Sequence, residues 1–251
     1  MSRINQVIII GHNPIAKVLY EKCKRSGVSV FWNDLSQGIN ADVIIETENS
    51  NREEKKKAIQ EIEAAVHPET TILSTVLRLP TTEIASWAQN PSRIVGFGTF
   101  ATIERTGLVE IAPALQTNPS HLNESKGFFR MIGNVTEVVK DEVGLVFPRI
   151  LAMIINEAAF ALMENTADAA SIDEAMKKGT NYPYGPLEWA EKIGLEDIYA
   201  ILQGLFDQLG EERYRPASLI KKLIYAGWTG EKAQKGFYYY QNHLRGSEVS
   251  E

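Results

Sequence analysis

The first 35 residues constrain the fold of this chain most, because apolar and polar residues alternate there as in a strand, a helix and a second strand. Residues 6–10 form an apolar run of strand length, residues 15–25 have helical spacing, and residues 28–32 form another apolar run. A turn at residues 11–14 joins the first run to the helix. This order is typical of a parallel sheet whose strands are connected by helices on its faces.

The same alternation continues along the first half of the chain and is then replaced by helical spacing alone. Further buried strands are predicted at residues 42–45, 71–73, 94–96 and 108–111, and helices at residues 52–65 and 81–88. A long apolar helix is predicted from residue 149, followed by helices at residues 171–178, 186–193, 198–209 and 218–226. We therefore predict an α/β fold with two domains. A shortened Rossmann-type parallel-sheet domain occupies residues 1–143, and an all-α C-terminal domain occupies residues 144–251.

Composition limits the partners that the chain can have. It carries 26 Lys and Arg against 32 Asp and Glu, a formal net charge of -6, whereas binding to nucleic acid requires a basic surface. No apolar run approaches the roughly 20 residues needed to cross a bilayer. The single cysteine, Cys23, excludes an intramolecular disulfide and a cysteine-rich metal site. We expect a cytoplasmic protein without nucleic-acid, membrane or metal partners.

The turn after the first strand, Gly11-His-Asn-Pro-Ile-Ala16, stands where dinucleotide-binding folds keep Gly-x-Gly-x-x-Gly. Gly11 permits the tight turn and Ala16 is a mild change, but Asn13 places a side chain where the backbone should approach a pyrophosphate. Pro14 removes one backbone donor from the phosphate site. Asp34, about 20 residues further on, favours NAD over NADP because its charge would repel a 2′-phosphate. Two interpretations remain open: a structural turn that no longer binds a nucleotide, and a site that binds NAD weakly.

Short motifs follow one another along the whole chain in a recognisable order. They are ADVIIE with a downstream lysine in residues 41–55, TILSTVLRLPTTEIA in residues 71–85, RIVGFGTFATIERTGLVEI in residues 93–111, KDEVGLVFPRIL in residues 140–151, and YGPL, YRP and KGFY in the helical half. From about Val7 to Tyr240 this set resembles the 3-hydroxyacyl-CoA dehydrogenase family, and in particular its bacterial 3-hydroxybutyryl-CoA members. The resemblance implies NAD as the cofactor and an acyl-CoA as the ligand.

The same resemblance assigns catalytic positions. The family oxidises the 3-hydroxyl of an acyl-CoA by hydride transfer to NAD, with a histidine base that a glutamate orients. The glutamate corresponds to Glu110, but the position of the histidine holds Gly98. The family's substrate-contacting serine and active-site asparagine correspond to Leu77 and Pro148. Because loss of a general base alone costs about 10²- to 10⁴-fold in rate, ordinary turnover is not expected.

The resemblance also assigns the cofactor site. The positions that it implies are Gly11, Asn13, Ala16, Asp34 and Lys55, with Ser50 in place of a glutamate that flanks the cofactor. The long helical excursion with which the family helps to clasp CoA is missing between residues 34 and 42. The helical half is expected to form a homodimer, because its long helix has more apolar surface than one subunit covers.

Two functions from different classes remain open. In the first, the chain is a non-catalytic relative of these enzymes: a scaffold, a regulator or a subunit. In the second, it is still an NAD-dependent oxidoreductase that acts on a different or smaller hydroxy substrate, through a relay of His12, Glu110 or water. His12 is the only histidine expected near the cleft. All four, His12, His67, His121 and His243, are expected to be surface residues.

Overall fold

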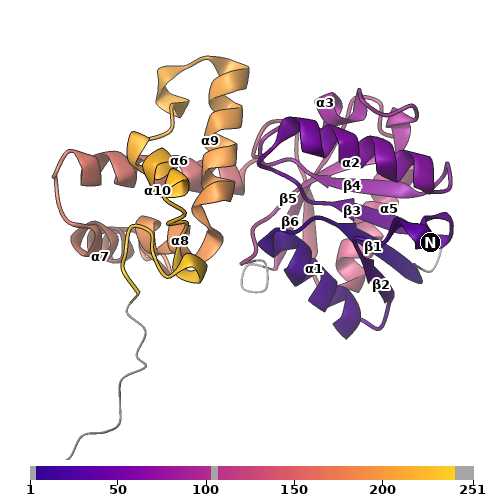
Figure 1. The fold of residues 1–251 in the computed structure, drawn as a ribbon, viewed down its shortest axis with the longest axis horizontal. Coiled ribbons are helices and arrows are strands. Elements are labelled where there is room, and N and C mark those ends of the chain that lie inside the picture. Colours follow the sequence, from indigo (N-terminus) through magenta and orange to yellow (C-terminus); the bar gives the residue numbers. More distant parts are fainter. Residues whose placement is uncertain (1–3, 103–106, 241–251) are drawn as a thin grey trace, which may run out of the picture. The chain divides into compact units, whose positions relative to one another are not determined.

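The computed structural model describes residues 4–102 and 107–240, and the chain divides into two compact units (Figure 1). Unit 1 consists of Met1–Ala152 with Ala200–Arg215, and unit 2 of Met153–Tyr199 with Pro216–Glu251. The sequence predicted one boundary, after residue 143. That boundary stays a prediction. By contact the chain passes between the units three times, twice within a helix and once between Arg215 and Pro216.

Unit 1 is built on a sheet that, among the described residues, has the strand order β2-β1-β3-β4-β5-β6-β7. The strands are β1 Gln6–Ile10, β2 Ser29–Trp32, β3 Val43–Glu46, β4 Thr71–Thr75, β5 Ile94–Gly98, β6 Leu108–Pro113 and β7 Val135–Val138. β1 to β5 are parallel, which confirms the predicted α/β fold. β6 runs antiparallel to β5, and β7 runs parallel to β6. The pattern of apolar runs did not predict this reversal, because alternation carries no information about strand direction.

Helices and short 3-10 turns connect the strands. In unit 1 they are α1 Pro14–Arg25, η1 Leu35–Asn40, α2 Arg52–Ala65, α3 Thr81–Ala85, η2 Pro91–Arg93, α5 Pro119–Met131 and η3 Glu212–Tyr214. α2 agrees with its predicted range, and its apolar positions Ile59 and Ile62 are fully buried against the sheet as expected. The sheet is therefore covered by helices that turn one apolar stripe toward it.

Helices account for the rest of the described chain. α6 Phe147–Met163 and α9 Leu195–Leu209 belong partly to each unit, and unit 2 also contains α7 Ala169–Thr180, α8 Pro186–Ile193, α10 Ser218–Tyr225 and η4 Glu231–Ala233. Asp173 organises unit 2: it accepts hydrogen bonds from the backbone N–H groups of Leu187 and Glu188, both at 2.8 Å, and from the Tyr238 hydroxyl at 2.6 Å. The predicted helical character of the second half is confirmed for the residues described. Within residues 4–102 and 107–240, no helix is both long and apolar enough to span a membrane.

One prediction for a histidine was wrong. His121 lies on α5, is only 7% exposed, and its Nδ1 is 2.7 Å from the Thr71 hydroxyl. Its segment was interpreted as a polar connection because it is rich in Ser and Asn, but the buried rings of Phe128 and Phe129 hold it against the sheet as a helix. Burial lowers the pKa of His121, an effect that the nearby Glu124 carboxylate opposes.

Two of the other three histidines lie within the described residues. His12 and His67 are exposed, as predicted. His243, for which a surface position in the tail was predicted, lies outside the described residues.

Candidate cofactor and substrate site

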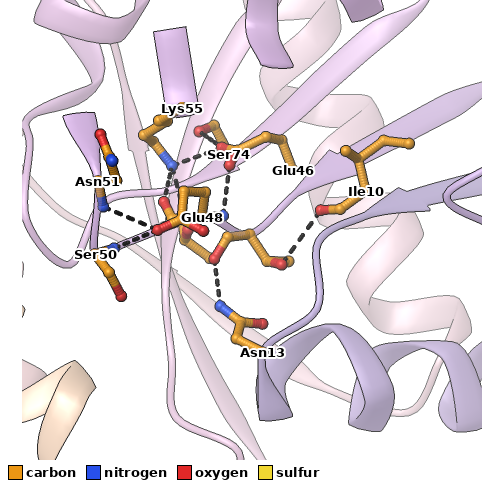
Figure 2. A network of polar contacts seen from close by, with 10 residues as sticks. Ile10, Asn13, Glu46, Glu48, Ser50, Asn51, Lys55 and Ser74 are labelled. Carbon is orange, nitrogen blue, oxygen red and sulfur yellow. Dashed lines mark hydrogen bonds and ion pairs between the residues drawn. The ribbon is translucent and has the colours of Figure 1, made fainter. Parts of the chain in front are cut away.

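The predicted site residues gather at one edge of the sheet in unit 1. β1, β3 and β4 are adjacent and parallel, and their last residues are in register: Ile10 lies beside Glu46, and Glu46 beside Ser74. The loops that follow these strands therefore meet at a common edge (Figure 2). In open α/β sheets, ligands bind outside the carboxyl ends of the strands in this way.

The turn after β1 requires its glycine. Gly11 has φ 139°, and a Cβ atom there would lie 2.0 Å from the Thr47 hydroxyl oxygen. The backbone N–H of Gly11 donates to Asn33 Oδ1 at 2.8 Å, and its carbonyl accepts from Trp32 Nε1 at 2.7 Å. Sequence reasoning did not identify Asn33 as part of this turn. Its signal is an asparagine directly after a strand, since asparagine tolerates the left-handed backbone that it adopts here, with φ 53°.

The side chain of Asn13 forms hydrogen bonds with nearby backbone groups. Its Oδ1 accepts a hydrogen bond from the N–H of Ala16 at 3.0 Å and caps α1, while its Nδ2 donates to the carbonyl of Thr47 (Figure 2). The N-terminus of this helix is where a dinucleotide-binding fold holds a phosphate. In this chain a side-chain carbonyl oxygen therefore already accepts from one of the donors that a phosphate would use.

Asp34 follows β2, where an acid can bond a cofactor ribose. It is half-buried, and its Oδ1 accepts from the N–H of Ser36 at 3.0 Å and from the Ser36 hydroxyl at 2.5 Å, so it also caps η1. The geometry of Gly11 and Asp34 fits the adenosine half of a dinucleotide. Asn13 is the side chain that opposes the phosphate half.

Lys55 belongs to a buried polar network beneath these loops. Its Nζ donates to Glu46 Oε2 at 2.6 Å, to the carbonyl of Glu48 at 2.7 Å and to the Thr75 hydroxyl at 3.3 Å. An ammonium group has three donors, so all of them are engaged within the chain. Ser74 donates to the same Glu46 oxygen at 2.6 Å (Figure 2). The assignment of Lys55 to cofactor binding stays a prediction, and it requires that one of these hydrogen bonds be exchanged.

Burial governs the titration of the Lys55 and Glu46 pair. Lys55 is 2% exposed and Glu46 is fully buried. Desolvation raises the pKa of the Glu46 carboxyl and lowers the pKa of the Lys55 ammonium, and the attraction between the two charges opposes both shifts. The pair fixes the loop after β3 to the ends of β3 and β4.

The two positions that the resemblance assigns to the base and its orienting acid are direct neighbours. Gly98 on β5 lies opposite Glu110 on β6 in the antiparallel register. A Cβ atom on Gly98 would lie 2.8 Å from Leu145 Cδ1, so a leucine side chain fills the space beside this glycine. Leu145 is buried and adopts φ 55°, a left-handed conformation that is uncommon for leucine.

Glu110 is held by the start of helix α6. It is 5% exposed, and its two carboxylate oxygens accept from the backbone N–H groups of Val146 and Phe147 at 2.8 and 2.9 Å. Glu110 is therefore a buried acid at the edge of the core, and both of its carboxylate oxygens have backbone hydrogen-bond partners. Since both partners are helix N-terminal donors, the carboxylate acts as the cap of α6.

The remaining substrate positions carry no polar side-chain contacts of the kind that the resemblance implies. Leu77, just after β4, is fully buried. Pro148 lies in the first turn of α6, where its missing N–H has little effect. Ser50 is exposed, and its N–H donates to Glu48 Oε1 at 2.6 Å.

Arg78 is a charged residue at this edge that sequence reasoning did not select. It lies three residues after β4, and its Nη1 donates to the carbonyl of Ser50. The signal was present in TILSTVLRLPTTEIA, where the arginine is the first charged residue after the predicted strand.

The fold and this edge define a class of protein. A parallel sheet with a glycine turn after the first strand and an acid after the second is the architecture of the dinucleotide-binding dehydrogenases. Residues 21–142 match the 3-hydroxyacyl-CoA dehydrogenase NAD binding domain, and residues 144–240 match the 3-hydroxyacyl-CoA dehydrogenase C-terminal domain. The chain belongs to the 3-hydroxyacyl-CoA dehydrogenase family, and its N-terminal half is that family's NAD-binding domain.

Individual relatives agree with this assignment. The chain is 34% identical over 227 residues to the 3-hydroxybutyryl-CoA dehydrogenase of Bradyrhizobium diazoefficiens, an alignment that covers 90% of this chain and 78% of that protein. It is 34% identical over 207 residues to a probable 3-hydroxybutyryl-CoA dehydrogenase of Bacillus subtilis, covering 82% of this chain and 72% of that one. The crystal structure of the (S)-3-hydroxybutyryl-CoA dehydrogenase from Ralstonia eutropha is similar with a TM-score of 0.82 and 25% identity, covering 96% of this chain and 100% of that chain.

Proposed function

We propose that this chain is a non-catalytic member of the family, in which the reaction on 3-hydroxyacyl-CoA is lost or strongly reduced. The observation that carries the proposal is the opposed pair of Gly98 and Glu110. The first has no side chain to accept a proton, and the second has both carboxylate oxygens occupied by backbone N–H groups. These hydrogen bonds favour the charged carboxylate and hold it against the first turn of α6, so they oppose a role of Glu110 as the replacement base.

The substrate positions support the same proposal. Leu77 and Pro148 offer no hydrogen-bond donor to a substrate oxygen, and the connection between β2 and β3 is the single short turn η1. A reacting group that is misplaced by about 1 Å can lose 10²-fold in rate. Several such losses together leave no turnover of an ordinary size.

The decisive experiment is the loss of NADH absorbance that depends on acetoacetyl-CoA. We expect turnover below about 1 s⁻¹, which is the lower end of ordinary enzymes. Gly98→His alone is expected to stay inactive as well. Turnover above that value in the unmodified chain would contradict the proposal and favour the alternative, an active NAD-dependent oxidoreductase.

We further propose that the chain binds NAD weakly and forms a homodimer in the cytoplasm. The weak affinity follows from Asn13, whose side chain accepts from a donor of the phosphate site. A dimer is supported by large apolar side chains of unit 2 that are exposed in a single chain, among them Tyr182 and Tyr225. Light scattering that gives the mass of a monomer at micromolar concentration would contradict the dimer. The cytoplasm is proposed because the chain has one cysteine, Cys23, and it is buried.

A further inference from the structure

Arg78 has a fixed backbone at the carboxyl edge of the sheet. It follows β4 by three residues, and the residues before it, Val76 and Leu77, are fully buried. In unit 1, Gly204 of α9 packs so closely on it that a Cβ atom on Gly204 would lie 2.1 Å from the Arg78 carbonyl oxygen. This position of the arginine is therefore determined by the core and not by a surface loop.

Arg78 is a partly buried residue, and its guanidinium has no carboxylate partner within the described parts of the chain. Its one hydrogen bond there is from Nη1 to the uncharged carbonyl of Ser50, and no described carboxylate lies within 4.0 Å. Two other arginines of unit 1 differ in this respect. Arg52 pairs with Glu83 at 2.8 Å, and Arg93 pairs with Glu63 at 3.3 Å.

Two acids at this edge, Glu46 at the end of β3 and Glu48 in the loop after it, have other partners. Glu46 accepts from Lys55 and Ser74. Glu48 uses Oε1 for the N–H groups of Ser50 and Asn51, at 2.6 and 2.9 Å (Figure 2). A guanidinium has five N–H donors, and a partly desolvated one gains most from an oxyanion that takes two of them at once.

We propose that Arg78 binds the oxyanion of a small ligand, a carboxylate or a phosphate group, at the carboxyl edge of β4. The proposed anion is distinct from the phosphates of a dinucleotide, because the phosphate turn follows β1 whereas Arg78 follows β4. β4 lies two strands away from β1 in the sheet, a separation of about 10 Å. The inference goes beyond the proposed function, since binding of an oxyanion needs no catalysis.

The test is calorimetric titration of the full chain with three probes, chosen so that the effect of the ligand's negative charge can be separated from the effect of its shape. 3-Hydroxybutyrate carries a carboxylate, 3-hydroxybutyramide is its neutral counterpart, and inorganic phosphate is the second oxyanion. Arg78→Gln removes the charge, and Arg78→Lys keeps the charge but lacks the paired N–H donors of a guanidinium. Arg130→Gln is the control at an exposed arginine of α5.

We expect at least one oxyanion to bind the unmodified chain and the Arg130→Gln variant equally, and the amide not to bind. Arg78→Gln should weaken that binding at least about tenfold, and Arg78→Lys should weaken it less. The oxyanion that binds distinguishes a carboxylate from a phosphate ligand. If Arg78→Gln does not fold, as judged by circular dichroism, Arg78→Lys decides: unchanged affinity in it overturns the proposal.

The proposal is overturned if neither oxyanion binds at about 10 mM, if the amide binds as well as the acid, or if Arg78→Gln binds as tightly as the unmodified chain. It is also overturned if Arg78→Gln weakens NADH binding alone. None of these results depends on the NADH oxidation assay, so failure here is distinguishable from failure of the proposed loss of catalysis.

Discussion

Replacing Glu110 with alanine should destabilise unit 1 although the chain is proposed to be inactive. The carboxylate is 5% exposed and accepts two backbone hydrogen bonds, at 2.8 and 2.9 Å, from the start of α6. Loss of a helix cap costs about 1–2 kcal/mol, and hydrogen bonds to a charged group contribute about 1.5–3 kcal/mol each before the cost of burying the charge is subtracted. We therefore expect Glu110→Ala to lower the free energy of unfolding by about 3 kcal/mol. Glu110→Gln should lose about half as much, because its amide oxygen can still accept one bond.

The assay is urea unfolding followed by tryptophan fluorescence, with Glu137→Ala as the matched control. Glu137 lies beside Glu110 in the parallel register of β6 and β7, but it is exposed. The control should change the free energy of unfolding by less than about 0.5 kcal/mol. An equally small change in Glu110→Ala would refute the capping role, and with it one argument for the proposed loss of catalysis.

The remaining predictions concern the buried pair, the base position and the phosphate turn. Lys55→Met should cost about 3–5 kcal/mol by leaving Glu46 buried and unpaired. The pKa of Glu46 is raised in the folded chain, and it should rise further without Lys55. The folded state then binds a proton more tightly than the unfolded state, so the free energy of unfolding falls as pH rises above the pKa of the unfolded chain. Urea unfolding at about pH 5 and pH 8 should show a larger fall in this free energy for the variant than for the unmodified chain. Gly98→Ala should cost about 1–2 kcal/mol by contact with Leu145, and a double-mutant cycle with Leu145→Ala should show coupling, whereas additive effects would contradict that contact. Asn13→Gly should tighten NADH binding about tenfold in a fluorescence titration, and a submicromolar dissociation constant in the unmodified chain would show that this side chain is no obstacle.

Much of the fold follows from local patterns. The strand, turn and helix at residues 6–25 were predictable because a buried parallel strand is a continuous apolar run and Asn13 with Pro14 begins a helix. α2 was predictable because its two inward-facing isoleucines interrupt a charged sequence at helical spacing. β7 and α5 were not, since Val135–Val138 is short and mostly exposed and residues 119–131 have weak helix formers.

The sequence alone determined which chemical groups the chain possesses. It placed a glycine at the position that the resemblance assigns to the histidine base, a leucine and a proline at the two positions that it assigns to substrate contacts, and an asparagine in the turn after the first strand. Those identities do not depend on the fold, because a side chain that is absent cannot be supplied by packing. They are the basis of the proposed loss of catalysis.

Only the tertiary structure decided what the retained groups do. Glu110 caps α6, all three donors of Lys55 are engaged, and Arg78 has no carboxylate partner within the described chain. The atoms that meet in these contacts are separated by 7 to 37 residues along the chain. A hydrogen bond or an ion pair depends on distances of a few ångströms, and these distances exist only after the sheet has set the register of its strands.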